Sequence, residues 1–116
     1  MMSPQALLER LIELFPDFAT YWNAPGNCFR EDDGSFTFCG AFTEFSHFFR
    51  KRYEELPKDR IAALGEFLAE CMAISDSELD VAPATCFLEN VAGERFSAEF
   101  KQFLYGEALA YYSQWE

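Results

Sequence analysis

The chain has 116 residues, half of them hydrophobic, and a formal net charge of −11 from 20 acidic and 9 basic side chains. This length predicts one helical domain over residues 1–116, and the hydrophobic content, with 14 Phe, excludes an intrinsically disordered chain. The negative charge is spread along the sequence and repels nucleic acid and anionic membranes, so we expect no binding to either. It suits a basic protein partner, or serves only to keep a Phe-rich protein in solution.

The N-terminal segment predicts two helices and a long loop. Ser3 and Pro4 are a favourable cap and first residue for a helix, and Pro16 ends it. Asp17 begins a short second helix that carries an aromatic cluster. Residues 23–35 contain the Gly, Pro, Asn and Asp that are typical of a loop.

A phenylalanine-rich helix follows this loop. The residues from Phe36 to Phe42 alternate as in a strand, but helical spacing continues as far as Leu56. The greater length favours a helix that begins near residues 37–40. Because Pro57 ends it and the connection is short, we expect an antiparallel αα-hairpin in which its Phe face packs against the next helix.

The segment from Pro57 to Ser75 predicts the central helix of the fold. Its apolar residues recur at intervals of three and four, which places them on one helical face, and alanines fill much of the remaining surface. We therefore expect neighbouring helices on more than one side of it. The apolar residues are Ile61, Leu64, Phe67, Leu68, Cys71, Met72 and Ile74.

The last third of the chain predicts several short helices. Ser75–Glu78 has the pattern of a capping box, and Ala84–Val91 predicts a short helix that Gly93 ends in a left-handed conformation. Ser97 is the expected cap of the next helix, and Gly106 separates that helix from the last one. The predicted fold class is all-α, a single compact domain of five to seven helices built from αα-hairpins.

The four cysteines include no Cys-x-x-Cys pair and predict free thiols rather than a disulfide framework. Two of them fall on apolar helical faces, where a thiol packs as a small hydrophobic group. The N-terminus lacks the pattern of a secretory signal, and no apolar run approaches the roughly 20 residues of a membrane span. We therefore expect a reducing, cytoplasmic location. The cysteines are Cys28, Cys39, Cys71 and Cys86.

Helix-face patterns are concentrated in three stretches, LIELFPDFATYW, RIAALGEFLAECMAISDSELDVAPATCFLENV and FLYGEALAYY. Together these stretches resemble a bacterial family of small, acidic, all-helical proteins of uncharacterised function. The resemblance implies a single domain of αα-hairpins and carries over no catalytic or ligand-binding residue. The chain departs from the family pattern in its heavy use of Phe between Phe29 and Phe49. In size and acidity it is also similar to immunity proteins that neutralise bacterial toxins, which is a weaker likeness.

The densest carboxylate cluster of the predicted loops lies in the run Arg30–Gly34. It does not fit a calcium-binding loop, because Phe29 and Gly40 stand where that pattern requires ligands. Adjacent carboxylates suit charge-assisted hydrogen bonds to Lys or Arg, and tryptophan is enriched at protein interfaces. A solvated turn and a tryptophan of the core are the alternatives. The candidate partner-binding residues are Glu31, Asp32, Asp33 and Trp22.

No set of residues in the sequence forms a recognisable catalytic or metal-binding motif. His47 is the only histidine, and no nucleophile pairs with it in a known pattern. Glu66 and Glu70 lie one helical turn apart without a matching histidine, which is typical of a solvated stripe. Glu54 and Glu55 lie just after the basic run Arg50–Arg52 and neutralise it locally. We expect no catalytic residues, no metal and no cofactor.

These observations predict a non-enzymatic, cytoplasmic binding protein, of immunity or regulatory type, that presents an acidic surface to a basic protein. The alternative is a small-ligand carrier or an enzyme with a pocket between the Phe-rich helix and the loop at residues 23–35. That alternative predicts a concave pocket with convergent polar groups. Self-association through exposed aromatic residues is a third hypothesis.

Overall fold

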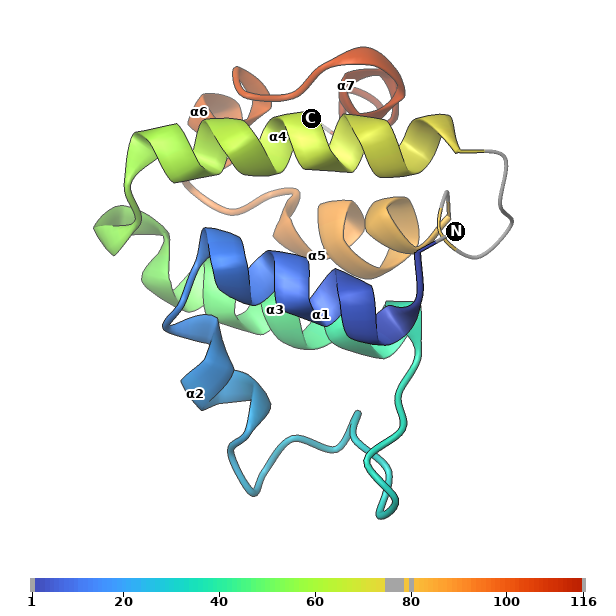
Figure 1. Cartoon of the computed structure of the whole chain (residues 1–116). Coiled ribbons are helices and arrows are strands. Elements are labelled where there is room, and N and C mark those ends of the chain that lie inside the picture. The colour runs from blue at the N-terminus through green and yellow to red at the C-terminus, as the bar shows by residue number, and fades with distance from the viewer. Residues whose placement is uncertain (1, 75–78, 80, 116) are drawn as a thin grey trace.

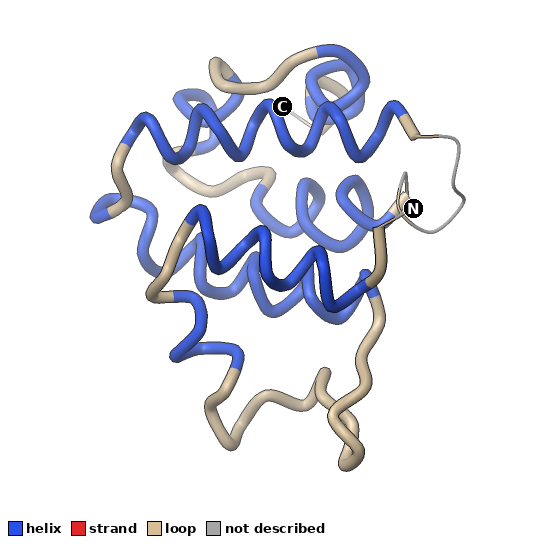
Figure 2. Tube along the Cα trace, in the orientation of Figure 1, coloured by secondary structure: helices blue, strands red, loops and turns tan. Residues whose placement is uncertain are grey.

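Helices are the only regular secondary structure in the part of the chain that the computed structural model describes, residues 2–74, 79 and 81–115. The predicted all-α domain of five to seven helices is confirmed (Figure 1 and Figure 2). The predicted capping box at residues 75–78 lies outside the described residues. The elements are α1 (Pro4–Leu14), α2 (Phe18–Trp22), α3 (Phe38–Arg52), the 3-10 turn η1 (Tyr53–Glu55), α4 (Lys58–Ala73), the π-helix η2 (Pro83–Leu88), α5 (Glu89–Val91), α6 (Ser97–Lys101) and α7 (Gly106–Tyr112).

The helices form two layers with a third helical run between them (Figure 1). Helices α1 and α3 lie side by side in one layer, and α4 crosses the other layer with α7 packed on it. The continuous run of η2 and α5 lies between the layers, where η2 packs against α3, α4 and α7. Helix α2 and the loop that follows it project beyond the first layer (Figure 1).

The run of η2 and α5 occupies the centre of the molecule. Five of the six residues of η2 are buried, and Phe87 and Val91 have no exposed surface, as predicted for this segment. The prediction that the helix after Pro57 would be the central element is therefore wrong. That longer helix gives the stronger periodic signal, whereas the burial of a six-residue segment depends on its neighbours and not on its length.

Helix α4 nevertheless has the predicted buried face and the predicted neighbours on more than one side. It packs against α7, η2 and α1. Ile74 does not belong to this face, because the helix ends at Ala73 and the Ile74 side chain is 42% exposed. The buried apolar residues are Ile61, Leu64, Phe67, Leu68, Cys71 and Met72.

Helix α3 supplies the aromatic centre of the core. The side chains of Phe42, Phe45, Phe48 and Phe49 have no exposed surface. The ring centroids of Phe45 and Phe49 each lie 5.3 Å from the ring centroid of Phe87 in η2. The predicted packing of the Phe face against the next helix is therefore wrong, because α3 packs chiefly on η2 and α4 packs chiefly on α7.

A disulfide bond joins Cys39 of α3 to Cys86 of η2, with Cα atoms 5.4 Å apart. The prediction that all four cysteines are free is therefore wrong for this pair, while Cys28 and Cys71 are free thiols. The two bonded cysteines are 47 residues apart in the sequence and meet only because α3 packs on η2. The expected cytoplasmic location loses the support that rested on free thiols, since stable disulfides are rare in reducing compartments.

Of the caps predicted within the described residues, those at Ser3 and Gly93 are present and the one at Ser97 is not. The hydroxyl of Ser3 accepts a backbone hydrogen bond at the start of α1, and that of Thr37 does the same at the start of α3. Gly93 has a φ of 88°, the left-handed conformation predicted for a residue that follows a helix. Ser97 is not the cap of α6. It lies inside that helix, and its hydroxyl is hydrogen-bonded to the hydroxyl of Tyr112 instead.

Gly65 allows α4 to approach the connection between α6 and α7. A Cβ atom at residue 65 would lie 1.9 Å from the carbonyl oxygen of Phe103, which is far inside van der Waals contact. We expect Gly65→Ala to lower the free energy of unfolding by roughly 1–3 kcal/mol or more, because a backbone group cannot swing aside as a side chain can. Urea unfolding monitored by circular dichroism measures this change.

The matched control is Gly26→Ala, in the exposed loop, where a Cβ atom would have nothing within 4 Å. This substitution should change the free energy of unfolding by less than about 0.5 kcal/mol. Equal effects of the two substitutions would show that α4 is not held against Phe103.

Candidate functional site

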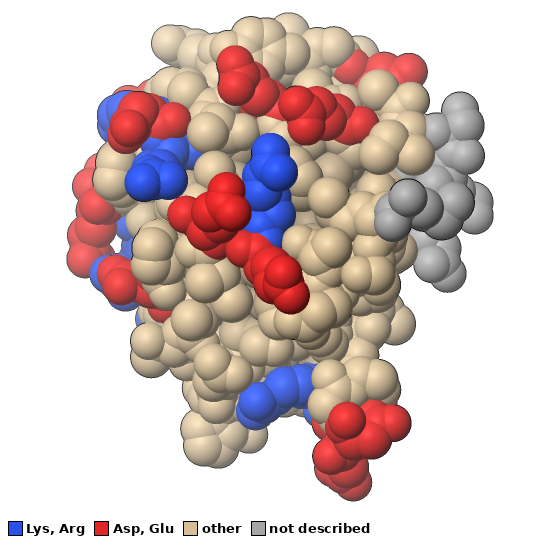
Figure 3. Space-filling view, viewed as in Figure 1, with Lys and Arg blue, Asp and Glu red and all other residues tan. Residues whose placement is uncertain are grey.

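The loop between α2 and α3, residues 23–37, projects from the helical body and is called the acidic loop below (Figure 1). Glu31, Asp32 and Asp33 are all exposed in it. Figure 3 shows acidic side chains gathered where this loop extends from the molecule. The structure therefore places the three predicted carboxylates together in solvent, at the part of the surface that extends farthest from the core.

Hydrogen bonds within the acidic loop define the conformation of its tip. The backbone N–H of Glu31 donates to the carbonyl oxygen of Ser35 over 2.9 Å, and the N–H of Gly34 donates to the carbonyl oxygen of Glu31 over 2.9 Å. Gly34 has a φ of 89°, which a residue with a side chain rarely adopts. These bonds fix the backbone that carries the carboxylates, so that a partner would lose little loop entropy on binding.

Asp33 has a structural role within this turn. Its Oδ1 atom accepts hydrogen bonds from the hydroxyl of Ser35 at 2.7 Å and from the backbone N–H of Ser35 at 2.9 Å. The hydroxyl bond, followed by the backbone bond, lowers the pKa of the Asp33 carboxyl below its usual value. The carboxylate therefore remains charged while its second oxygen stays available for another donor.

Trp22 supports the acidic loop from the inside. Its side chain is 3% exposed, and its ring centroid lies 4.7 Å from that of Phe36 at the other end of the loop. Asn27 is buried between these ends, donates from Nδ2 to the carbonyl oxygen of Trp22 at 2.8 Å and accepts from the N–H of Phe29 at 3.0 Å. Trp22 is thus a core residue and not a surface contact, while sequence reasoning missed the structural role of Asn27.

A hollow of about 310 Å³ lies where the alternative function predicts a pocket, between the acidic loop and the start of α3. The Glu31 carboxylate and the hydroxyl groups of Ser35 and Thr37 are among its polar groups. The loop is in close contact with the helix here, since a Cβ atom at Gly40 would lie 3.2 Å from the Cβ atom of Phe29. Two cysteines, Cys28 and Cys39, also line this hollow.

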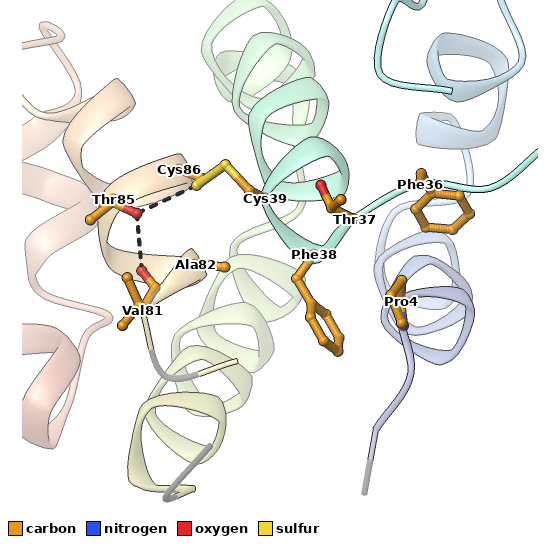
Figure 4. Close-up of a pocket in the computed structure, with 9 residues that line it drawn as sticks. All are labelled: Pro4, Phe36, Thr37, Phe38, Cys39, Val81, Ala82, Thr85 and Cys86. Atoms are coloured by element: carbon orange, nitrogen blue, oxygen red, sulfur yellow. Dashed lines mark hydrogen bonds between the residues drawn. A yellow bond between two sulfur atoms is a disulfide. The ribbon is translucent and has the colours of Figure 1, made fainter. Parts of the chain in front are cut away.

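A second cavity, of about 420 Å³, lies on the other side of Cys39 (Figure 4). The first residue of α1, the start of α3 and the start of η2 enclose it, and the disulfide forms part of its wall. Its lining is mainly apolar, with two threonine hydroxyl groups. The lining residues are Pro4, Phe36, Thr37, Phe38, Cys39, Val81, Ala82, Thr85 and Cys86.

His47 lies on the exposed side of α3. Its Nδ1 atom lies 3.0 Å from Oε1 of Glu44, one turn earlier in the helix. A broad hollow of about 510 Å³ beside it is lined by charged residues and Tyr21, with no serine, threonine or cysteine among its described lining residues. Within the described part of the chain, no three His, Cys, Asp or Glu side chains form a group that could hold a metal ion.

Three polar side chains connect η1, α4 and α6. Both Lys58 and Tyr53 donate hydrogen bonds to Oε1 of Glu99, and the bond from the Tyr53 hydroxyl is 2.7 Å long. The bond from Lys58, followed by that from Tyr53, lowers the pKa of Glu99 below its ordinary value of 4.5. Burial, followed by the bond to Glu99, raises the pKa of the Tyr53 phenol well above its usual range.

The Glu99 carboxyl should make the stability of the fold depend on pH. Its pKa is lower in the folded protein than in the unfolded chain, so its interactions stabilise the fold above the unfolded-state pKa of about 4.5. This contribution disappears as the pH falls through the lower, folded-state pKa. We expect Glu99→Gln to reduce the free energy of unfolding at about pH 7, and the difference from the wild type to shrink at about pH 3.

Urea unfolding at several pH values measures this difference. Glu66→Gln, at an exposed position on α4, is the control, and its difference from the wild type should not follow the same pH dependence. If the Glu99→Gln difference is constant between about pH 7 and about pH 3, the Lys58–Glu99 interaction does not stabilise the fold.

None of the helices within the described residues is both long and apolar enough to cross a membrane. No protein-family model matches the chain, and no curated protein or solved structure is similar enough to count as a match. The resemblance to a family of small acidic helical proteins therefore stays a prediction, and the case for a function depends on the acidic loop and the two adjacent hollows.

Proposed function

We propose that the protein is a non-enzymatic binding module that recognises a basic protein through the acidic loop. Glu31, Asp32 and Asp33 are the contact carboxylates. The observation that supports this function is the exposure of three adjacent carboxylates on a loop whose backbone is held by its own hydrogen bonds. Trp22 is not part of the contact surface because it is buried.

The charge environment of the loop favours an intermolecular partner. Ion pairs among the described residues neutralise other acidic side chains, for example Asp17 and Glu55 with Arg52, and Glu99 with Lys58. None of the ion pairs found there involves the three loop carboxylates. Lys and Arg side chains of a partner would therefore form charge-assisted hydrogen bonds with them without displacing an existing pair.

The class of partner follows from this chemistry and from the weaker likeness to toxin-immunity proteins. A basic toxin or another basic regulatory target would match a net charge of −11 and be attracted over distance before contact. We place this encounter in the cytoplasm. In that compartment the Cys39–Cys86 disulfide would be of the transient or redox-sensing kind rather than a permanent bond.

Charge removal distinguishes a specific loop contact from general electrostatic attraction. The loop variant Glu31→Gln, Asp32→Asn, Asp33→Asn keeps the size and one acceptor oxygen of each side chain and removes three charges. We expect it to bind an arginine-rich decapeptide about tenfold or more weakly at about 0.15 M salt, because it loses charge-assisted contacts. Fluorescence anisotropy of the labelled peptide measures the dissociation constant.

The matched control removes the same number of charges from exposed helical positions, with Glu13→Gln, Glu66→Gln and Glu70→Gln. Its binding of the same peptide should weaken by no more than about threefold, since only the general field changes. Equal weakening of the two variants would mean that the acidity acts as a diffuse field, and the loop would not be a binding site.

A second candidate function is the binding of a small apolar ligand. The observation that favours it is the cavity of about 420 Å³ beside the disulfide, which is lined by Phe36, Phe38, Val81 and Ala82. Cavities of roughly 300–1,000 Å³ with mainly apolar linings are typical of small-molecule sites. Figure 4 shows its lining residues on the first residue of α1, on α3 and η2, and on the segments just before α3 and η2.

Filling this cavity tests the second function. The wild type should increase the fluorescence of a neutral apolar dye such as Nile red, and Thr85→Phe should abolish the increase by occupying the cavity. Thr20→Phe, on the exposed side of α2, is the control and should leave the increase unchanged. An equal dye response in both variants would show that the cavity does not bind the ligand.

A further inference from the structure

Three of the four cysteines lie around the start of α3. Cys39 is exposed and occupies the first turn of this 15-residue helix, while its disulfide partner Cys86 is 8% exposed in η2. Cys28 is a free, exposed thiol on the acidic loop. Of the two bonded cysteines the one on α3 is therefore the more exposed, and an exposed free cysteine lies on the segment that packs against this helix.

Cys28 and Cys39 lie on two segments that pack against each other. Both residues line the same hollow of about 310 Å³. The residues that follow them in the sequence, Phe29 and Gly40, are in close contact, because a Cβ atom at Gly40 would lie 3.2 Å from the Phe29 Cβ atom and 3.5 Å from its carbonyl oxygen. The buried Asn27 fixes the same segment, since its Oδ1 accepts the N–H of Phe29. Cys86 is absent from the described lining of this hollow.

We propose that Cys28, Cys39 and Cys86 form a thiol–disulfide exchange site. Cys28 loses its proton to solvent, and the thiolate attacks the Sγ atom of Cys39. The bond between Cys28 and Cys39 forms as the bond between Cys39 and Cys86 breaks, and Cys86 leaves as a thiolate that takes up a proton. One disulfide replaces another, so that no net oxidation occurs and no external oxidant is needed.

The surroundings of Cys86 stabilise it as the leaving group. The hydroxyl of Thr85 lies 3.4 Å from the Cys86 Sγ atom (Figure 4). In the disulfide form this hydroxyl donates its one hydrogen to the carbonyl oxygen of Val81 over 3.2 Å, and it turns that hydrogen to Cys86 when the sulfur becomes a thiolate, which is a better acceptor than a disulfide sulfur. At the attacked sulfur, the positive end of the α3 dipole favours the approach of an anion to Cys39.

The exchange moves the covalent link from one pair of elements to another. Before it, α3 is bonded to η2 across 47 residues of sequence. After it, α3 is bonded to the acidic loop, and the wall of the cavity of about 420 Å³ is no longer cross-linked. This activity goes beyond the proposed binding of a basic protein, and it links the thiol chemistry of the chain to the loop that carries Glu31, Asp32 and Asp33.

Disulfide mapping of the full-length oxidised protein tests the proposal. The protein is incubated without oxygen at several pH values from neutral to mildly alkaline, quenched in acid, digested with pepsin at low pH and analysed by mass spectrometry. We expect a Cys28–Cys39 linked peptide, together with a free Cys86 thiol, to accumulate faster as the pH and thus the thiolate fraction rise. A wild-type protein that yields only the Cys39–Cys86 peptide at every pH overturns the proposal, as does a product that links Cys28 to Cys86.

Three variants complete the test. Cys28→Ser, at an exposed position, should abolish the exchanged product while circular dichroism shows an unchanged fold. Cys71→Ala should leave the exchange unchanged, because the Cys71 thiol is buried and burial raises its pKa to about 12. Thr85→Val should slow the exchange without changing the fold, since it removes the hydroxyl that lies beside the leaving sulfur. Exchange in Thr85→Val at the wild-type rate contradicts the role of that hydroxyl.

Discussion

The enclosure of η2 between α3, α4 and α7 is the constraint on which the rest of the structure depends. A helical segment of six residues is not stable alone in water, so it persists because its neighbours bury five of its side chains. Phe87 has no exposed surface and contacts the rings of Phe45 and Phe49. The Phe-rich helix is thereby fixed on η2, which brings Cys39 and Cys86 within bonding distance. The two cysteines line the cavity of about 420 Å³.

The start of α3 packs against the acidic loop and also carries one of the two disulfide-bonded cysteines. Thr37 caps the helix, Gly40 admits the backbone of Phe29, and Cys39 lines hollows on two sides. Glycine at position 40 allows this close approach, because a Cβ atom there would lie 3.2 Å from the Phe29 Cβ atom. The same contact that fixes the loop therefore also brings the segment that carries Cys28 against the helix that carries Cys39.

The acidic loop shows how a charged surface is supported by an apolar interior. Its carboxylates are exposed, yet the loop keeps its shape because Trp22 packs on Phe36 and the buried Asn27 satisfies backbone groups at its base. Without this support, three adjacent negative charges would favour an extended, mobile segment. Binding of a basic partner and thiol exchange would thus both depend on one rigid connection between α2 and α3.

The sequence alone determined the helical class, where α1, α3 and α4 begin, and the exposure of Glu31, Asp32 and Asp33. Helical periodicity, prolines and caps are local signals, so they can be read from neighbouring residues. Only the tertiary structure decided that η2 is central, that Trp22 is buried and that Cys39 meets Cys86. These outcomes depend on which apolar faces pair across long sequence separations, and the spacing of residues along one helix does not specify its partner.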